Sequence, residues 1–214
     1  MFWQSRIFKT FIIIFSMIFI LTACNNSKDL KNKSESINES NIKEVSESSF
    51  LMDTIVDMKV YGEEAEKAID KSFAKMKQIE EKMSRNIDSS DISKININAG
   101  KDWVKVDKDT FKVIEKALYY AKLTKGKFDP TIGPLVSLWG IGTSESQVPS
   151  EEQINKMKNL VNYKSLKLDS NKNKVMLSEK GMKLDLGAIA KGFAADEVRE
   201  IVLNHDIKSA FVNL

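Results

Sequence analysis

The sequence contains very little cysteine and histidine, and each shortage excludes a class of site. Its only cysteine is Cys24, so the chain cannot form an internal disulfide or a cluster of cysteine ligands around a metal. Its only histidine, His205, argues against a metal centre built from imidazole ligands. A metal bound by this chain is therefore expected to have oxygen ligands, which favours Mg²⁺ or Ca²⁺ over zinc.

The chain also lacks a large excess of either charge. Its 33 Lys and Arg residues against 30 Asp and Glu residues give a formal net charge of +3, without a large basic block. Composition therefore gives no reason to expect a nucleic-acid partner. The length of 214 residues is enough for one domain together with an export segment.

Residues 1–23 have the pattern of a bacterial lipoprotein signal peptide. Two basic residues precede an apolar run over 11–21, which is shorter than the roughly 20 residues that span a bilayer. The run ends in Leu-Thr-Ala-Cys at 21–24, which resembles a lipobox. We predict cleavage before Cys24 and lipid modification of this cysteine, including palmitate, which would anchor the protein to the extracytoplasmic face of the cell membrane. A plain secretory signal with an incidental cysteine is the alternative.

Residues 24–48 are rich in Ser, Asn, Lys and Glu and have few large apolar side chains. Such a segment cannot bury a core, so it is predicted to be a disordered tether. Random-coil scaling gives it a reach of about 25–30 Å. The folded domain is predicted to occupy 49–214.

Hydrophobic periodicity in 49–214 predicts an α+β domain with a mixed or antiparallel sheet packed by helices. Strands are predicted over 54–61, 103–106, 165–169, 174–177, 182–186 and 209–214, and helices over 65–83, from an Asp107 cap to a Gly126 stop, over 150–160 and over 189–203. The polar segment 84–99 is predicted to be a loop.

The stretch 182–196 joins a predicted strand to a predicted helix through a small-residue turn. Asp185 lies at the end of the strand, and Lys191 is expected in the first turn of the helix. A cation there opposes the helix dipole at a cost of about 0.3–1 kcal/mol, which a bound phosphate would reverse. An ordinary strand–turn–helix with a surface lysine is the alternative.

The second marked stretch is Phe-Asp-Pro-Thr-Ile-Gly-Pro-Leu-Val-Ser-Leu-Trp-Gly at 128–140, which holds two of the three prolines in the chain. Its prolines and glycines predict a stiff apolar loop over 128–142, suited to one wall of a pocket for a flat heterocycle. Trp139 is expected to pack into the core.

Both stretches resemble the ApbE family, the FAD:protein FMN transferases. The first carries Asp-Leu-Gly-Ala-Ile-Ala-Lys-Gly-Phe-Ala-Ala-Asp at 185–196. Two weaker matches precede them: Met52-Asp53-Thr54, where the family often has Met-Gly-Thr, and residues 80–96. Asp53 in place of Gly is a departure from the family pattern. The resemblance covers about 50–214 and implies an ApbE-like layered sheet with packing helices.

The resemblance also implies site residues. FAD contacts are implied for Met52, Asn86, Lys127, Phe128, Asp129, Asp185 and Lys191. The backbone carbonyl of Ala188 is implied as a ligand of Mg²⁺, which requires an unpaired carbonyl such as a turn at 187–188 would supply. Asn86 replaces a tyrosine that many members carry, and in the family this asparagine accompanies hydrolysis of FAD to FMN and AMP.

The implied reaction is Mg²⁺-dependent transfer of FMN from FAD to a Ser or Thr hydroxyl of a membrane-associated acceptor, the FMN-binding domain of a redox complex, with release of AMP. An FAD pyrophosphatase and a non-catalytic flavin-binding lipoprotein are the alternatives. The other metal ligands of the family lie beyond Leu214, where an apolar strand ends abruptly. We therefore expect the first part of a longer protein, with little or no activity of its own.

Overall fold

The computed structural model describes residues 42–214. The predicted signal peptide at 1–23, the lipidation site Cys24 and residues 24–41 of the predicted tether lie outside the described residues. Among residues 42–214, no helix has the length and hydropathy needed to cross a membrane.

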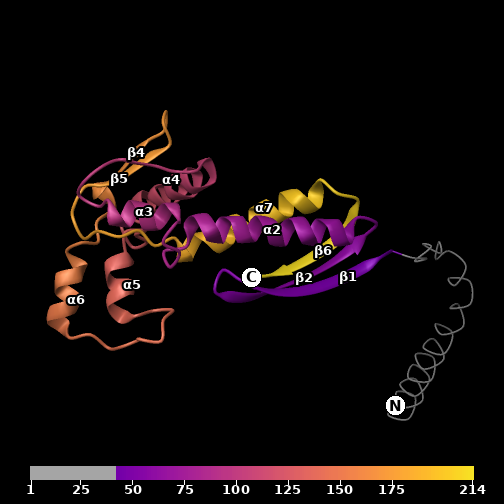
Figure 1. The fold of residues 1–214 in the computed structure, drawn as a ribbon, viewed down its shortest axis with the longest axis horizontal. Helices are drawn as coiled ribbons and strands as arrows, with labels where there is room; N and C mark the ends of the chain where they lie inside the picture. The colour runs from indigo at the N-terminus through magenta and orange to yellow at the C-terminus, as the bar shows by residue number, and fades with distance from the viewer. Residues whose placement is uncertain (1–41) are drawn as a thin grey trace, which may run out of the picture. The chain divides into compact units, whose positions relative to one another are not determined.

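The first layer is an antiparallel sheet in the order β1-β2-β6. It consists of β1 (Glu44–Leu51), β2 (Thr54–Gly62) and β6 (Ile207–Asn213). Two long helices, α2 (Ala65–Met83) and α7 (Gly187–Leu203), cover one face of this sheet (Figure 1). The alternating side chains Val56, Met58 and Val60 point toward these helices and are buried, as a strand with one covered face requires.

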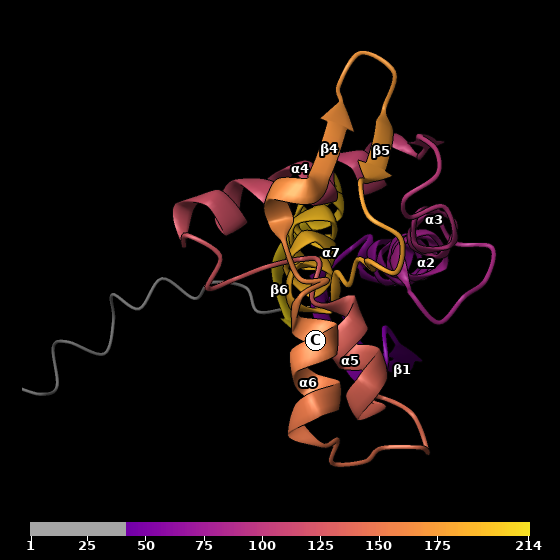
Figure 2. The same ribbon diagram turned by 90° about the vertical axis from the view of Figure 1, so that its left-hand side faces the viewer.

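A second antiparallel sheet has the order β3-β5-β4 and lies close to α3 and α4 (Figures 1 and 2). Its strands are β3 (Val104–Lys105), β5 (Lys174–Leu177) and β4 (Leu166–Asp169), and the helices are α3 (Asp91–Ile97) and α4 (Lys108–Leu123). Helices α5 (Gly133–Trp139) and α6 (Glu151–Lys158) pack beside each other. A short 3-10 turn, η1 (Tyr163–Ser165), leads into β4.

Several predicted elements are confirmed because local chemistry determines them. Helix α2 has the predicted bounds, since its apolar residues recur every three or four positions. Asp107 caps α4 by accepting a hydrogen bond from the Asp109 amide. Ser150 and Gln153 form the reciprocal capping box at the start of α6. The hairpin β4–β5 also forms as predicted.

Three predictions were wrong at particular segments. The tether was predicted to extend to residue 48, but residues 44–48 already belong to β1, because they pair with residues 57–61 of β2. The loop predicted over 84–99 contains α3, which the Ser90 side chain caps and which buries Ile92 and Ile95. The loop predicted over 128–142 contains α5, which begins next to Pro134, a residue well suited to the first turn of a helix.

The predicted strand at 182–186 is also wrong, although its alternation is right. Met182, Leu184 and Leu186 are buried as expected. The segment makes only one isolated bridge, between Ile132 and Lys183. The Asn96 side chain takes the place of a neighbouring strand, because its Oδ1 accepts from Leu184 N (2.6 Å) and its Nδ2 donates to Leu184 O (3.1 Å).

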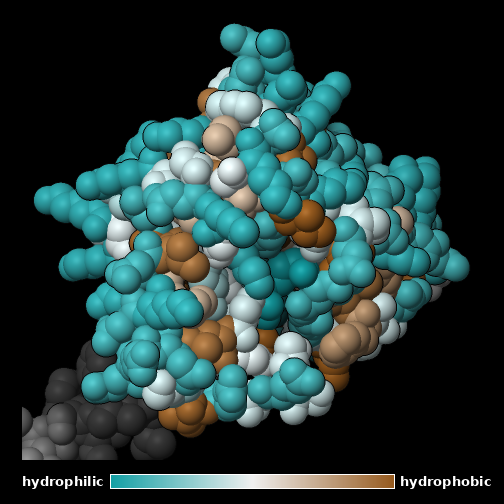
Figure 3. All heavy atoms as spheres, turned by 60° about the vertical axis from the view of Figure 1, so that its left-hand side comes forward, coloured by the Kyte–Doolittle hydropathy of each residue, from teal (hydrophilic) through white to brown (hydrophobic). Residues whose placement is uncertain are grey.

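Apolar side chains also reach the surface. On the face drawn in Figure 3 they form separate groups among hydrophilic residues. Phe50 and Ile55, which are opposite each other in β1 and β2, are both exposed, as is Phe211 on β6. Single exposed apolar residues are common on protein surfaces and need no functional explanation.

An Asp107→Asn variant is expected to lose a small, pH-dependent part of the stability. Lys82 Nζ lies 2.9 Å from the Asp107 carboxylate, and this hydrogen-bonded ion pair lowers the pKa of Asp107 below its ordinary value. Because the pKa of Asp107 is lower in the folded chain than in the unfolded chain, its ionised carboxylate stabilises the fold at pH values above the ordinary pKa. This contribution decreases as the pH falls below about 4. Because both side chains are about one-third exposed and Asn also caps helices, we expect a loss of about 0.5 kcal/mol at pH 7. Urea unfolding at pH 7 and pH 3 checks this; a difference at pH 3 as large as that at pH 7 would contradict it.

Candidate functional site

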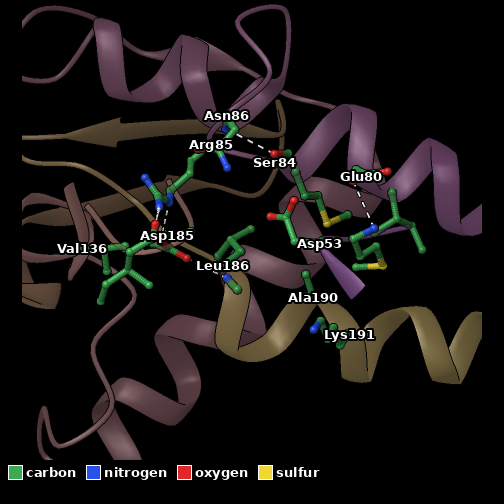
Figure 4. A pocket seen from close by; sticks show the side chains of 16 residues that line it. Asp53, Glu80, Ser84, Arg85, Asn86, Val136, Asp185, Leu186, Ala190 and Lys191 are labelled. Carbon is green, nitrogen blue, oxygen red and sulfur yellow. Dashed lines mark hydrogen bonds and ion pairs between the residues drawn. The ribbon is translucent and has the colours of Figure 1, made fainter. Parts of the chain in front are cut away.

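A cavity of about 310 Å³ lies where the β1–β2 turn, the end of α2 and the start of α7 come together (Figure 4). Its size is within the range of small-molecule sites. Its lining residues come from four segments that are far apart in the sequence: Met52 and Asp53; Ile79, Glu80, Met83, Ser84, Arg85 and Asn86; Val136, Ile141 and Gly142; and Asp185, Leu186, Gly187, Ala190 and Lys191.

The β1–β2 turn contributes a strained backbone to this cavity. Met52 and Asp53 have positive φ angles of 54° and 59°, which a two-residue hairpin turn of this kind requires. Glu80 Oε1 on α2 accepts a hydrogen bond from Met52 N at 3.0 Å and holds the turn in place. Asp is among the few residues with a side chain that tolerate this conformation. The backbone at Asp53 therefore has the conformation that glycine adopts freely, despite the substitution.

Asp185 connects the start of α7 to two other segments. Its Oδ1 accepts from Gly187 N at 2.8 Å, and its Oδ2 pairs with Arg85 Nε at 2.9 Å. Its backbone N donates to Pro130 O at 2.9 Å, which links it to the 128–134 segment. The hydrogen bond to the first helical amide explains why α7 begins here without a capping side chain at Leu186.

Lys191 lies two residues further into α7 than the sequence indicated. The helix begins at Gly187, so Lys191 is its fifth residue and the prediction that it occupies the first turn was wrong. Helical side chains tilt toward the N-terminus, so Lys191 still lines the cavity. Within residues 42–214, its Nζ has no ion-pair or hydrogen-bond partner in the protein, and no acidic residue lies in the first turn of α7. It is therefore free to pair with an anion.

The charged lining of the cavity is nearly balanced. Three carboxylates (Asp53, Glu80 and Asp185) face two cations (Arg85 and Lys191), which gives a formal charge of −1. The Asp185 carboxylate is compensated by Arg85. A dianionic ligand would therefore need positive charge beyond what these side chains supply.

The cavity brings together four of the seven residues to which the sequence assigned FAD contacts: Met52, Asn86, Asp185 and Lys191. Lys127, Phe128 and Asp129 do not line it. The Asp129 carboxylate instead accepts hydrogen bonds from Thr131 N (2.8 Å), Thr131 Oγ1 (2.6 Å) and Tyr163 N (2.9 Å). Through these bonds Asp129 connects the segment before α5 to the residues that follow α6.

Arg85 and Glu80 are site residues that the sequence analysis missed. Both lie in the stretch 80–96, in which the family resemblance implied a role only for Asn86. A usable signal was present for Arg85, because it is one of only two arginines in residues 42–214, and the other, Arg199, is an exposed helix residue. An arginine that follows a helix of lysines is a reason to look for a carboxylate partner.

The described residues do not form a metal centre by themselves. The turn expected at 187–188 is absent, because Ala188 is the second residue of α7, where carbonyls normally accept from the amide four residues later. Ala188 lines a different cavity of about 740 Å³ between α4 and α7. Among residues 42–214, no group of three or more His, Cys, Asp or Glu side chains is placed to hold an ion.

Comparisons with known proteins agree with this fold and with the two marked stretches. The model of the ApbE family matches residues 52–214. A curated FAD:protein FMN transferase of Treponema pallidum is 31% identical over 182 residues, covering 81% of this chain and 50% of the relative. One from Klebsiella pneumoniae is 34% identical over 167 residues, covering 78% and 52%. The chain thus spans about half the length of the curated relatives it matches.

Solved structures give the same result. The crystal structure of an ApbE protein from Thermotoga maritima superposes with a TM-score of 0.74 at 34% identity, covering 80% of this chain and 56% of the other. The flavin transferase ApbE from Vibrio cholerae has a TM-score of 0.74 at 24% identity, covering 81% and 58%, which is a likeness of fold. The predicted α+β class with helices packed on a sheet is therefore confirmed.

Proposed function

Since the chain belongs to the ApbE family, we propose that its cavity binds FAD and serves the transfer of FMN from FAD to a Ser or Thr hydroxyl of an acceptor protein. One observation carries the proposal. The family stretch at 185–196 and the Met52–Asp53 turn, which are far apart in the sequence, form opposite parts of one cavity that holds an unpaired lysine. The curated relatives named FAD:protein FMN transferase support the reaction.

The proposed chemistry is a substitution at phosphorus. The acceptor hydroxyl oxygen forms a bond to the phosphorus of the FMN half and releases its proton to the solvent, while the bond from that phosphorus to the bridging oxygen breaks and AMP leaves with that oxygen. Reactions of this kind depend mainly on positioning and on neutralising the phosphate oxygens. In this chain Lys191 would neutralise a phosphate oxygen, and Met52 would position the flavin nucleotide.

We also propose that FAD binds together with Mg²⁺. The support is electrostatic: the lining has a formal charge of −1, and a diphosphate adds about two further negative charges that the protein does not compensate. Mg²⁺ is commonly bound through substrate phosphates and only one or two protein groups, so an incomplete protein site is no obstacle. Titrating FAD fluorescence with Mg²⁺ and with EDTA tests this. Equal affinity in both conditions would contradict it.

The observation that Asn86 lines the cavity favours a second candidate, hydrolysis of FAD to FMN and AMP. Water would then replace the acceptor hydroxyl. Incubation of the protein with FAD and Mg²⁺, with and without an acceptor flavoprotein, separates the possibilities. Release of AMP and FMN without acceptor supports hydrolysis, and covalent FMN on the acceptor supports transfer. Tight FAD binding with neither product supports a non-catalytic flavin-binding protein.

We propose further that the protein acts at the extracytoplasmic face of the cell membrane. The support is the sequence of 1–24, where an apolar run ends at Cys24. A lipid on Cys24 would keep the domain within reach of membrane-associated acceptors, such as the FMN-binding domain of a redox complex. Fractionation of cells that express the parent and a Cys24→Ala variant tests this. An equal membrane fraction for both would contradict lipid anchoring.

A Lys191→Ala variant is expected to bind FAD about tenfold more weakly, because hydrogen bonds to charged groups contribute about 1.5–3 kcal/mol. The stability should change little, since the Lys191 ammonium has no partner among the described residues. The measurement is the dissociation constant of FAD from flavin fluorescence, beside urea unfolding. Lys156→Ala, an exposed lysine on α6, is the matched control. An unchanged dissociation constant for Lys191→Ala would contradict the phosphate role.

A further inference from the structure

We propose that Arg85 is a positioning residue that makes the cavity acceptable to an anionic dinucleotide. Its guanidinium compensates the Asp185 carboxylate and holds the α5–α6 loop, residues 140–150, against the start of α7. This inference rests on the proposed function for the identity of the ligand. The contacts on which it is based are formed between residues of this chain and involve no ligand.

Arg85 joins three segments of the chain. It follows directly after the end of α2 and Ser84. Its Nε lies 2.9 Å from Asp185 Oδ2, and its Nη2 donates to Ile141 O at 2.6 Å. Figure 4 shows the guanidinium reaching across to Asp185 beside Val136. One side chain thus fixes the distance between the end of α2, the loop after α5 and the N-terminus of α7.

The Arg85–Asp185 pair is the least exposed of the ion pairs among residues 42–214. The two side chains are 19% and 15% exposed, so solvent screens them less than the surface pairs. Without Arg85, the Asp185 carboxylate would lie uncompensated in the wall of a cavity that is proposed to take a diphosphate. Repulsion between like charges in such a place weakens the binding of anions and does not affect a neutral ligand.

A guanidinium is suited to this position in a way that an ammonium is not. Arg presents several N–H groups in one plane, so Nε and Nη2 donate to two acceptors at the same time. Lysine has a single charged nitrogen on a flexible stem. It would keep the positive charge near Asp185 but would not reach both Asp185 and Ile141 with the same geometry.

The test compares the binding of FAD and of riboflavin, which has no phosphate. The variants are Arg85→Met, Arg85→Lys and the double variant Arg85→Met with Asp185→Asn; Arg199→Met, which changes an exposed arginine on α7, is the control. Arg85→Met should weaken FAD binding about tenfold or more, the effect of one uncompensated charge, and riboflavin binding less than about threefold. Arg85→Lys should be intermediate, and Arg199→Met should equal the parent.

The double variant is the decisive comparison. It removes the carboxylate together with the cation, so its affinity for FAD should return to within about threefold of the parent. FAD binding as weak as in Arg85→Met would mean that Arg85 or Asp185 contacts the ligand directly, and the proposal would be overturned. Equal weakening of FAD and riboflavin in Arg85→Met would overturn it as well, since it would indicate lost packing.

Hydrogen exchange without any ligand separates this inference from the proposed function. In Arg85→Met, the amides of 140–147 and of Gly187 should exchange faster, while those in the middle of α2 should match the parent. Unchanged exchange at 140–147 and Gly187 overturns the positioning role whatever the ligand is. If the parent binds neither FAD nor riboflavin, the proposed function fails, and the exchange result alone decides the role of Arg85.

Discussion

Replacing Gly133 with alanine is expected to lower the free energy of unfolding by about 2–4 kcal/mol, because no space exists for the added methyl group. A Cβ at this position would lie 2.6 Å from both the carbonyl oxygen and the Cβ of Lys183. The oxygen belongs to the backbone and cannot rotate away. It also accepts the hydrogen bond from Gly133 N at 3.2 Å, and the neighbouring Ile132 forms the bridge to Lys183.

The substitution should therefore push the 128–134 segment away from 183–185. Since Asp185 N also donates to Pro130 O, the start of α7 would move with it, and FAD affinity should fall along with stability. Urea unfolding followed by circular dichroism measures the loss of stability.

The matched control is Gly192→Ala, in the interior of α7. A Cβ at Gly192 meets no atom within 4 Å, so only the backbone preference of the residue changes. Alanine is favoured over glycine inside a helix by about 0.5–1 kcal/mol, so this variant should be slightly more stable than the parent. A Gly133→Ala variant as stable as Gly192→Ala would mean that the two segments do not approach as closely as described.

Replacing Asp129 with alanine is expected to lower the free energy of unfolding by about 3–5 kcal/mol. Its carboxylate accepts hydrogen bonds from three donors, on Thr131 and on Tyr163. Thr131 is fully buried, so its amide has no ready access to water. Bonds to an ionised acceptor are roughly twice as strong as neutral ones, and buried donors left without a partner add a further cost.

Asp129→Asn should lose less, about half as much, because the amide oxygen replaces only one of the two acceptor oxygens and its NH₂ faces a donor. Asp70→Ala, an exposed position on α2, is the control and should change stability by less than about 0.5 kcal/mol. Thermal and urea unfolding give the values. The result also tests the sequence-based role of Asp129. Asp129→Asn that weakens FAD binding with unchanged stability would favour a ligand contact over the structural role.

The sequence identified part of the candidate site through local motifs, but it did not identify the contacts between distant segments. Motifs indicated Met52, Asn86, Asp185 and Lys191 from three places in the sequence, and the fold brings them to one cavity. No motif identified Asp185 as the partner of Arg85 or indicated that Glu80 would hold the turn at Met52. These contacts depend on the paths of α2 and α7, which no local pattern contains.

The sequence by itself determined the elements whose signals lie within a few residues. These signals connect residues only a few positions apart, so periodicity and capping rules were sufficient. They are the apolar spacing of α2, the Asp107 cap of α4, the capping box of α6 and the turn of the β4–β5 hairpin.

Only the tertiary structure decided how 182–186 and the site around it are held. The alternation of Met182, Leu184 and Leu186 reports which side chains are buried, but it does not say what satisfies the backbone between them. Here the Asn96 side chain, 88 residues away in the sequence, does so in place of a strand. A backbone N–H donates to any well-placed acceptor, and which acceptor it meets is fixed only when the chain has folded around it.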